Sequence, residues 1–192
     1  MKDNKILVLG IDSSKRKTGV CIIAYSKVDG KDVYEIVEKA LIKVPAIPNE
    51  PIFYSEYKSY LLLQEFLKKY VNDLDYSALE GFAFGGQGLT KLASTAAVYQ
   101  LYLCQINKVI THIAPTRVKL IVGGSGKATK EEVRKGLDTF IPNASSLKWP
   151  SYDVSDAAAI AVASIYVNIN PDKFPPTKKK VIKRKLKKES DE

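Results

Sequence analysis

The sequence predicts an α/β domain built on a mixed five-stranded sheet flanked by helices, and two patterns favour it. Residues 6–12 are almost continuously apolar, which is typical of a central strand buried on both faces. Residues 19–25 and 33–42 are predicted as two further strands, separated by Asp29-Gly30, a dipeptide typical of hairpin turns. Helices and strands alternate after this antiparallel meander, which predicts a mixed sheet.

The rest of the chain supplies the alternating elements. In chain order we expect a helix at 56–72, a strand that holds Glu80, a helix at 89–106, a strand at 109–114, a helix that begins near Pro115, and helices at 130–140 and 153–168. Proline suits the first turn of a helix because its missing N–H would be unpaired there in any case. A meander followed by this alternation is the order expected of a ribonuclease-H-like domain.

Positive charge is concentrated at the C-terminus. The 192 residues carry a net charge of +9, of which +6 lies in residues 173–192. We therefore expect one domain over residues 1–172 and a basic, disordered tail over 173–192, which either binds nucleic acid or only raises solubility. No stretch is long enough for a transmembrane helix. Cys21 and Cys104 lie in apolar patterns and are expected to be buried free thiols, and His112 is expected in the core.

Four carboxylates stand at the ends of predicted elements. Asp12 closes the first strand, Glu80 lies in or at the end of the fourth, and Asp153 and Asp156 share one face of the last helix. Taken singly, each is more simply a turn former, a helix cap or a partner of the helix dipole. Together they form the oxygen-rich set that hard cations such as Mg²⁺ prefer, so they are candidate metal ligands of a nuclease.

These residues resemble the RuvC-type Holliday-junction resolvases. The segment Leu9-Gly10-Ile11-Asp12, the strand with Glu80, the segment 118–123 and the closing Asp153-x-x-Asp156 occur in that family's order, over about residues 5–168. The family also has two functional lysines eleven residues apart, and Lys119 and Lys130 reproduce that spacing.

The resemblance implies a ribonuclease-H-like nuclease with a defined set of site residues. The implied catalytic residues are Asp12, Glu80, Asp153, Asp156, Lys119 and Lys130. The four acids would bind two Mg²⁺ ions, with Mn²⁺ as a substitute, and the two lysines would contact a phosphate. Two ions about 4 Å apart clamp the attacking and leaving oxygens of a phosphodiester in line.

The chain departs from the family in several places. Residues 13–17 replace a common Pro-Gly, and Ala83 occupies the position of the family's base-contacting aromatic. The neighbouring Phe84 is the candidate base-stacking residue, and Lys127 is a candidate DNA contact. The glycine-rich segment 123–127 lacks the spacing of a phosphate-binding loop, which argues against nucleoside triphosphate binding. These departures indicate a divergent member, with a phage or other viral origin as one hypothesis.

The sequence therefore predicts a metal-dependent endonuclease that resolves four-way DNA junctions in recombination, repair or viral genome processing. Paired cleavage needs two active sites, which implies a homodimer, with the helix at 89–106 as its contact. Two alternatives stay open: a related nuclease acting on RNA or on branched replication intermediates, and a non-catalytic DNA-binding protein. The expected partner is branched DNA rather than a membrane. The expected location is the nucleoid or cytoplasm of a bacterial cell or infected host.

Overall fold

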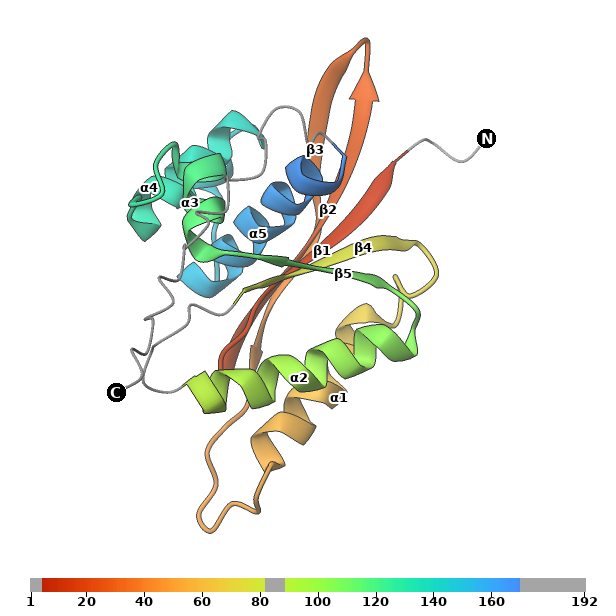
Figure 1. The fold of residues 1–192 in the computed structure, drawn as a ribbon, viewed down its shortest axis with the longest axis vertical. Helices are drawn as coiled ribbons and strands as arrows, with labels where there is room; N and C mark the ends of the chain where they lie inside the picture. Colours follow the sequence, from red (N-terminus) through yellow and green to blue (C-terminus); the bar gives the residue numbers. More distant parts are fainter. Residues whose placement is uncertain (1–4, 82–88, 170–192) are drawn as a thin grey trace, which may run out of the picture.

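A mixed five-stranded sheet forms the centre of the molecule, as the sequence predicts (Figure 1). The computed structural model describes residues 5–81 and 89–169. The strand order is β3-β2-β1-β4-β5, so the first strand lies in the middle of the sheet. This position explains why residues 6–12 are apolar almost throughout, since both faces of a central strand are covered.

The first three strands form the predicted antiparallel meander. They are β1 (Ile6–Asp12), β2 (Lys17–Val28) and β3 (Lys31–Lys43). The β2–β3 turn places Asp29 at φ 51° and Gly30 at φ 75°. Positive φ at both central residues characterises the tight turn that matches the twist of a hairpin, and Asp-Gly tolerates it best. The turn sets the register of both long strands from Val28 back to Ile23, beyond which the pairing shifts by one residue.

Two parallel strands complete the sheet. They are β4 (Leu74–Glu80), beside β1, and β5 (Val109–Ile113), at the edge. In the β1–β4 register Ile11 lies opposite Leu79, so Asp12 and Glu80 follow at the same end of adjacent strands. The carboxyl ends of parallel strands at a change of direction in the sheet are where α/β folds commonly hold their ligands.

Helices cover both faces of the sheet (Figure 1). Helices α1 (Tyr54–Leu67) and α2 (Leu89–Gln105) pack on one face, against a core that includes Leu9 and Ile11. The other face carries α3 (Pro115–Gly123), α4 (Lys130–Gly136) and α5 (Tyr152–Asn168), with 3-10 turns at Leu137–Thr139 and Ala144–Ser146. Helix α5 crosses β1 and β2, where its alanines meet Val8, Cys21 and Ile23 in a second core.

Three expectations from the sequence are wrong in detail. The first helix begins at Tyr54 and ends at Leu67, because residues 68–73 continue only as turns. Cys104 is exposed, since it lies on the outward face of α2, whereas Cys21 is buried as expected. His112 is also exposed, because β5 is an edge strand with few covering side chains. None of the helices in the described ranges is long and apolar enough to cross a membrane.

Candidate active site

Three acidic and two basic side chains from five different elements meet at one end of the sheet. They line a cavity of about 300 Å³ together with apolar residues of α3, α4 and α5. The five are Asp12 of β1, Glu80 of β4, Asp156 of α5, Lys119 of α3 and Lys130 of α4. The two strand carboxylates come together because β1 and β4 are parallel neighbours.

Glycines bring α5 against the strand that carries Asp12. A Cβ added to Gly10 would lie 2.0 Å from the carbonyl oxygen of Ala157, and one added to Gly19 would lie 1.9 Å from that of Asp153. Gly19 is also the β2 partner of Asp12 in the sheet register. The first turn of α5 is thus held directly beside Asp12, at a distance that any larger residue would prevent.

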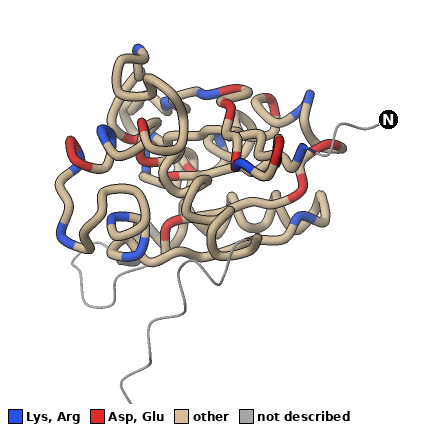
Figure 2. Tube along the Cα trace, turned by 90° about the horizontal axis from the view of Figure 1, so that it is seen from above, with Lys and Arg blue, Asp and Glu red and all other residues tan. Residues whose placement is uncertain are grey.

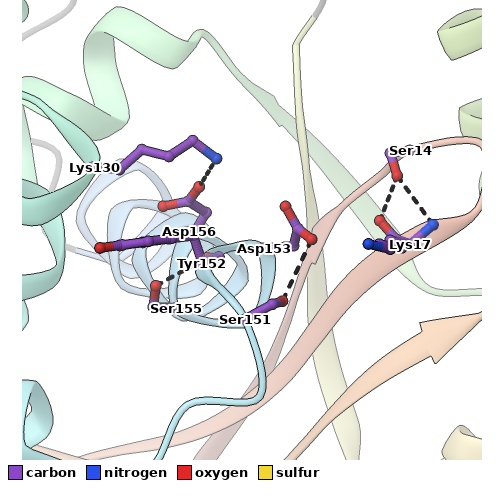
Figure 3. Close-up of polar contacts among 8 residues, drawn as sticks. All are labelled: Ser14, Lys17, Lys130, Ser151, Tyr152, Asp153, Ser155 and Asp156. Atoms are coloured by element: carbon purple, nitrogen blue, oxygen red, sulfur yellow. Dashed lines mark hydrogen bonds and ion pairs between the residues drawn. The ribbon is translucent and has the colours of Figure 1, made fainter.

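Asp153 lies next to the cavity rather than in its lining. Its carboxylate accepts a hydrogen bond of 3.4 Å from Ser151 Oγ, just before the first turn of α5 (Figure 3). Its charge still acts on the cavity, because it raises the pKa of both Asp12 and Asp156. The two acids of α5 therefore differ in position: Asp156 faces the other acids, and Asp153 lies beside them.

The negative charge of these carboxylates is only partly neutralised by the neighbouring lysines. The pKa of Asp12 is raised from 3.8 to about 8, first by burial and then by the neighbouring charges of Glu80 and Asp156. Burial likewise raises the pKa of Glu80, with the charge of Asp156 as the second cause. The pKa of Asp156 is raised by burial despite an ion pair that lowers it. Such a cluster favours states in which the carboxylates are protonated or bind a metal cation over the state in which all of them are ionised and unbound.

Lys130 supplies the nearest positive charge. Its Nζ lies 2.7 Å from Asp156 Oδ2 (Figure 3). The start of α4 is fixed by a capping box, in which Thr129 Oγ1 accepts a hydrogen bond from the Glu132 N–H and the Glu132 carboxylate accepts one from the Thr129 N–H. Lys130 is the first residue after that cap, so the box sets the direction from which its side chain enters the cavity.

A chain of hydrogen bonds that sequence reasoning missed orders the loop after Asp12. The buried hydroxyl of Tyr99 on α2 donates to Thr18 Oγ1 at 2.8 Å, and Thr18 in turn donates to the carbonyl of Ser14 at 3.1 Å. Ser14 Oγ also donates a hydrogen bond to the carbonyl of Lys17 across the loop (Figure 3).

Glycines inside the apolar strands were a sequence signal for the close contact with α5. The partnership of Tyr99 with Thr18, 81 residues apart, had no such signal.

Two sequence candidates remain, Lys127 and Phe84. Lys127 is exposed in the loop before α4 and does not line the cavity. Phe84 lies outside the residues that the structure describes. The structure therefore brings together five of the six predicted catalytic residues around one cavity and leaves Asp153 beside it.

The donor chemistry suits a hard cation. All the acidic donors are carboxylate oxygens, and their raised pKa values mark a deficit of positive charge. Within residues 5–81 and 89–169, no three Asp, Glu, His or Cys side chains are arranged to hold one ion as they stand. A cation on Asp156 would compete with the ammonium of Lys130 for the same oxygen. The residues fit a divalent metal once that ion pair opens.

Comparisons with known proteins point to one family. The profile of the family described as "Crossover junction endodeoxyribonuclease RuvC" matches residues 8–164. The RuvC of Sulfurovum sp. is 28% identical over 160 residues, covering 82% of this chain and 94% of that protein. The RuvC of Campylobacter jejuni is 30% identical over 158 residues, covering 81% and 92%.

Solved structures agree on the fold. Thermus thermophilus RuvC in complex with a Holliday junction substrate superposes with a TM-score of 0.69 at 22% identity, covering 86% of this chain and 96% of that one. Identity this low supports the fold alone. The profile, however, spans most of the chain and includes Asp12, Glu80 and Asp156, and the curated relatives cover about four fifths of the chain. The chain therefore belongs to the RuvC family of crossover junction endodeoxyribonucleases.

Proposed function

We propose that this protein is a metal-dependent endonuclease that resolves four-way DNA junctions by paired phosphodiester hydrolysis. The observation that carries this proposal is the single cavity shared by Asp12, Glu80, Asp156, Lys119 and Lys130 in a chain of the RuvC family. Phosphodiester hydrolysis needs an activated water and relief of negative charge at the leaving oxygen. Clustered acids and adjacent lysines provide the groups for both requirements.

We propose Mg²⁺ as the metal, with Mn²⁺ as a substitute, and two ions held by Asp12, Glu80, Asp153 and Asp156. The support is the charge imbalance of the cluster, in which the pKa of Asp12 reaches about 8. When bound, the ions would supply the activated water and the charge relief. The chain's own part is to hold the acids rigidly: β1 and β4 fix two of them, and the contact of Gly19 with α5 fixes the others.

Lys119 and Lys130 are proposed to hold the reacting or adjacent phosphate. Both line the cavity, and the charges of both lower the pKa of Glu80, so both act at close range. Lys130 is bonded to Asp156 here, and release from that carboxylate would leave its ammonium facing the same cavity. A lysine acts on phosphate as a compact point charge, which suits a contact that forms as negative charge shifts.

Further DNA contacts are proposed outside the cavity. Lys127 is exposed and has the charge to bind a phosphate, Phe84 is proposed to stack on a base, and residues 173–192 are proposed as an electrostatic arm at the nucleoid. Figure 2 shows basic and acidic residues interspersed over the described trace. Deleting the residues after Pro176 should weaken binding to every DNA shape alike and flatten its salt dependence, as affinity measured against salt would show.

We propose a two-fold homodimer that contacts through α2. An apolar hollow of about 470 Å³ lies between α1 and α2, and its lining includes Tyr57, Ala97, Val98 and Leu101. Tyr57 and Leu101 are 58% and 56% exposed, and their gathering in one hollow makes a contiguous apolar surface of the kind that marks interaction sites. Leu101→Lys should halve the mass measured by light scattering, whereas the same change at another exposed apolar residue, Val28→Lys on the hairpin, should not.

One experiment tests the proposed function against its alternatives. Four-way, forked and duplex DNA and an RNA–DNA hybrid are incubated with the protein in Mg²⁺, in Mn²⁺ and in chelator. We expect metal-dependent cleavage of the four-way junction in two strands. Asp12→Asn, Glu80→Gln and Asp156→Asn should abolish cleavage and leave junction binding largely intact, because affinity comes mainly from basic residues on phosphates. The matched control is Asp29→Asn in the exposed hairpin turn.

The outcomes separate the candidates. Preference for the hybrid or for forks over the four-way junction would favour the related nuclease, and binding without cleavage would favour a DNA-binding protein. Substantial metal-dependent cleavage by any of the three acid variants would overturn the site assignment.

A further inference from the structure

Two large apolar side chains stand exposed just before α1, at the active-site end of the sheet. Ile52 is 86% exposed and Phe53 is 67% exposed, and Phe53 also borders the apolar hollow assigned above to the subunit contact. They line a groove of about 530 Å³ together with Lys15 and Arg16 of the loop that follows Asp12. Figure 1 shows the β3–α1 connection extending from the sheet at the end to which the chain of β1 runs. The groove is separate from the cavity that holds the carboxylates.

The segment that presents these side chains is fixed to the catalytic loop. The Val44 N–H donates to the carbonyl of Arg16 at 3.0 Å, and Arg16 Nη1 donates to the carbonyl of Pro45 at 3.1 Å. Arg16 Nη2 also lies 2.6 Å from the Glu50 carboxylate. These contacts hold the Ile52–Phe53 pair at a set position relative to Asp12, because Arg16 is only four residues beyond it.

Phe53 has a backbone conformation that its side chain does not favour. Its φ is 62°, in the left-handed region, and it is the residue immediately before the first turn of α1 without a capping hydrogen bond from its side chain. A bulky residue with positive φ is an outlier, and asparagine is preferred both in this conformation and at this helix position. Folding alone therefore gives no reason for an exposed phenylalanine here, and such outliers are enriched where a ligand is bound.

Two basic and two acidic side chains line the groove, namely Lys15, Arg16, Glu50 and Glu56. Arg16 is paired with Glu50, and Glu56 is buried with the hydroxyls of Ser55 and Ser94 as its partners. Lys15 stands at the groove, and Lys17 lies opposite Lys43 in the adjoining β2–β3 register. None of these three lysines forms an ion pair with another residue in the described parts of the chain. A lysine without an ion-pair partner beside an apolar surface suits the phosphates and bases of a nucleic acid strand.

We propose that Ile52 and Phe53 form a stacking platform for unpaired nucleobases at the branch point of the DNA, with Lys15 on a neighbouring phosphate. The inference rests on the proposed junction substrate. Lys15 is three residues from Asp12, a reach of about 10 Å in an extended chain, which corresponds to about three base steps. A phosphate bound by Lys15 thus lies within a few nucleotide steps of the phosphate to be cleaved. Duplex DNA keeps its bases stacked on each other, so the platform selects for branched DNA.

Phe53→Asn separates a contact with DNA from a role in folding. Loss of a DNA contact lowers the affinity for the junction, whereas loss of a folding role lowers the Tm. Asparagine adopts the left-handed backbone conformation more readily than phenylalanine, so the variant should have a Tm at least equal to that of the wild type. Loss of one base–aromatic stack should weaken junction binding about tenfold and leave duplex binding unchanged. Val28→Asn, at an exposed apolar residue on the hairpin, is the matched control and should change neither affinity. Lys15→Gln should weaken binding to junction and duplex alike and reduce the slope of log affinity against log salt concentration by about one.

The measurements are the affinities for a four-way junction and a duplex of the same sequence in chelator, the Tm and the mass by light scattering. Wild-type cleavage is assayed in parallel. Equal junction affinity of Phe53→Asn and wild type would overturn the platform while leaving the proposed function in place. A lower Tm of Phe53→Asn would show a role of Phe53 in folding, and a halved mass would show a subunit contact. Either result would also overturn the platform. A wild type that neither cleaves nor prefers the junction would overturn the proposed function itself.

Discussion

Replacing Asp12 with Asn is expected to stabilise the metal-free protein while it abolishes cleavage. Asp12 is enclosed at the end of a central strand, and the charges of Glu80 and Asp156 lie close to it. Its pKa is therefore raised to about 8, which means that ionising this carboxylate opposes folding. Asparagine has nearly the shape of protonated aspartate and carries no charge at any pH.

The magnitude follows from the two pKa values. The ordinary pKa of aspartate is 3.8, and that of Asp12 in the folded protein is about 8. The folded state binds more protons between these values, so stability is highest below pH 3.8 and is lost as the pH rises towards 8. Each pH unit in this window costs about 1.4 kcal/mol. The wild type should thus lose up to about 4 kcal/mol by pH 7 relative to Asp12→Asn, as an upper limit set by the access of water to the cavity.

The assay is urea unfolding in chelator at pH 5, 6, 7 and 8. The difference in free energy of unfolding between Asp12→Asn and the wild type should grow from about 1.5 kcal/mol at pH 5 towards its limit near pH 8. Asp29→Asn, in the exposed hairpin turn, is the control and should follow the wild type at every pH. Adding Mg²⁺ should raise the free energy of unfolding of the wild type more than that of Asp12→Asn, because the ion binds the folded state.

A constant difference between Asp12→Asn and the wild type across this pH range would refute the reasoning. It would mean that Asp12 is ionised in the folded protein at low pH, so that the cluster is not strained in the absence of metal. A variant less stable than the wild type would show instead that the carboxylate makes a hydrogen bond that Asn does not replace.

Three further changes test how the site is held together. Gly19→Ala should abolish cleavage and cost several kcal/mol of stability, because its Cβ would meet the first turn of α5 at 1.9 Å; Gly126→Ala, whose Cβ would meet only the Thr116 carbonyl at 3.5 Å, is the control in urea unfolding. Lys130→Ala should lower the rate of junction cleavage more than affinity and move the pH–rate profile to higher pH, since Lys130 lowers the pKa of Asp12; Lys127→Ala should change only binding. Tyr99→Phe should cost about 1 kcal/mol in the same unfolding assay and slow single-turnover cleavage, and an unchanged rate would show that the loop after Asp12 is ordered without this bond.

The sequence by itself determined the strands and most helices, because local patterns act over a few residues. Continuous apolar residues predicted β1, the Asp29-Gly30 turn predicted the hairpin, and Pro115 predicted the start of α3. It also predicted which acids and lysines to examine, since their order and spacing resembled those of a known family. His112 and Cys104 were misjudged because apolar neighbours along the chain do not reveal whether an edge strand or an outer helix face is covered.

Tertiary structure alone decided how those residues meet. Glu80 joins Asp12 because β4 pairs with β1, and Asp156 faces the cavity while Asp153 stands beside it because Gly19 fixes the rotation and depth of α5. The raised pKa of Asp12, the ion pair of Lys130 with Asp156, and the bond from Tyr99 to Thr18 all depend on distances between distant segments. Electrostatic energies and hydrogen bonds change steeply over a few ångströms, and sequence patterns carry no information on that scale.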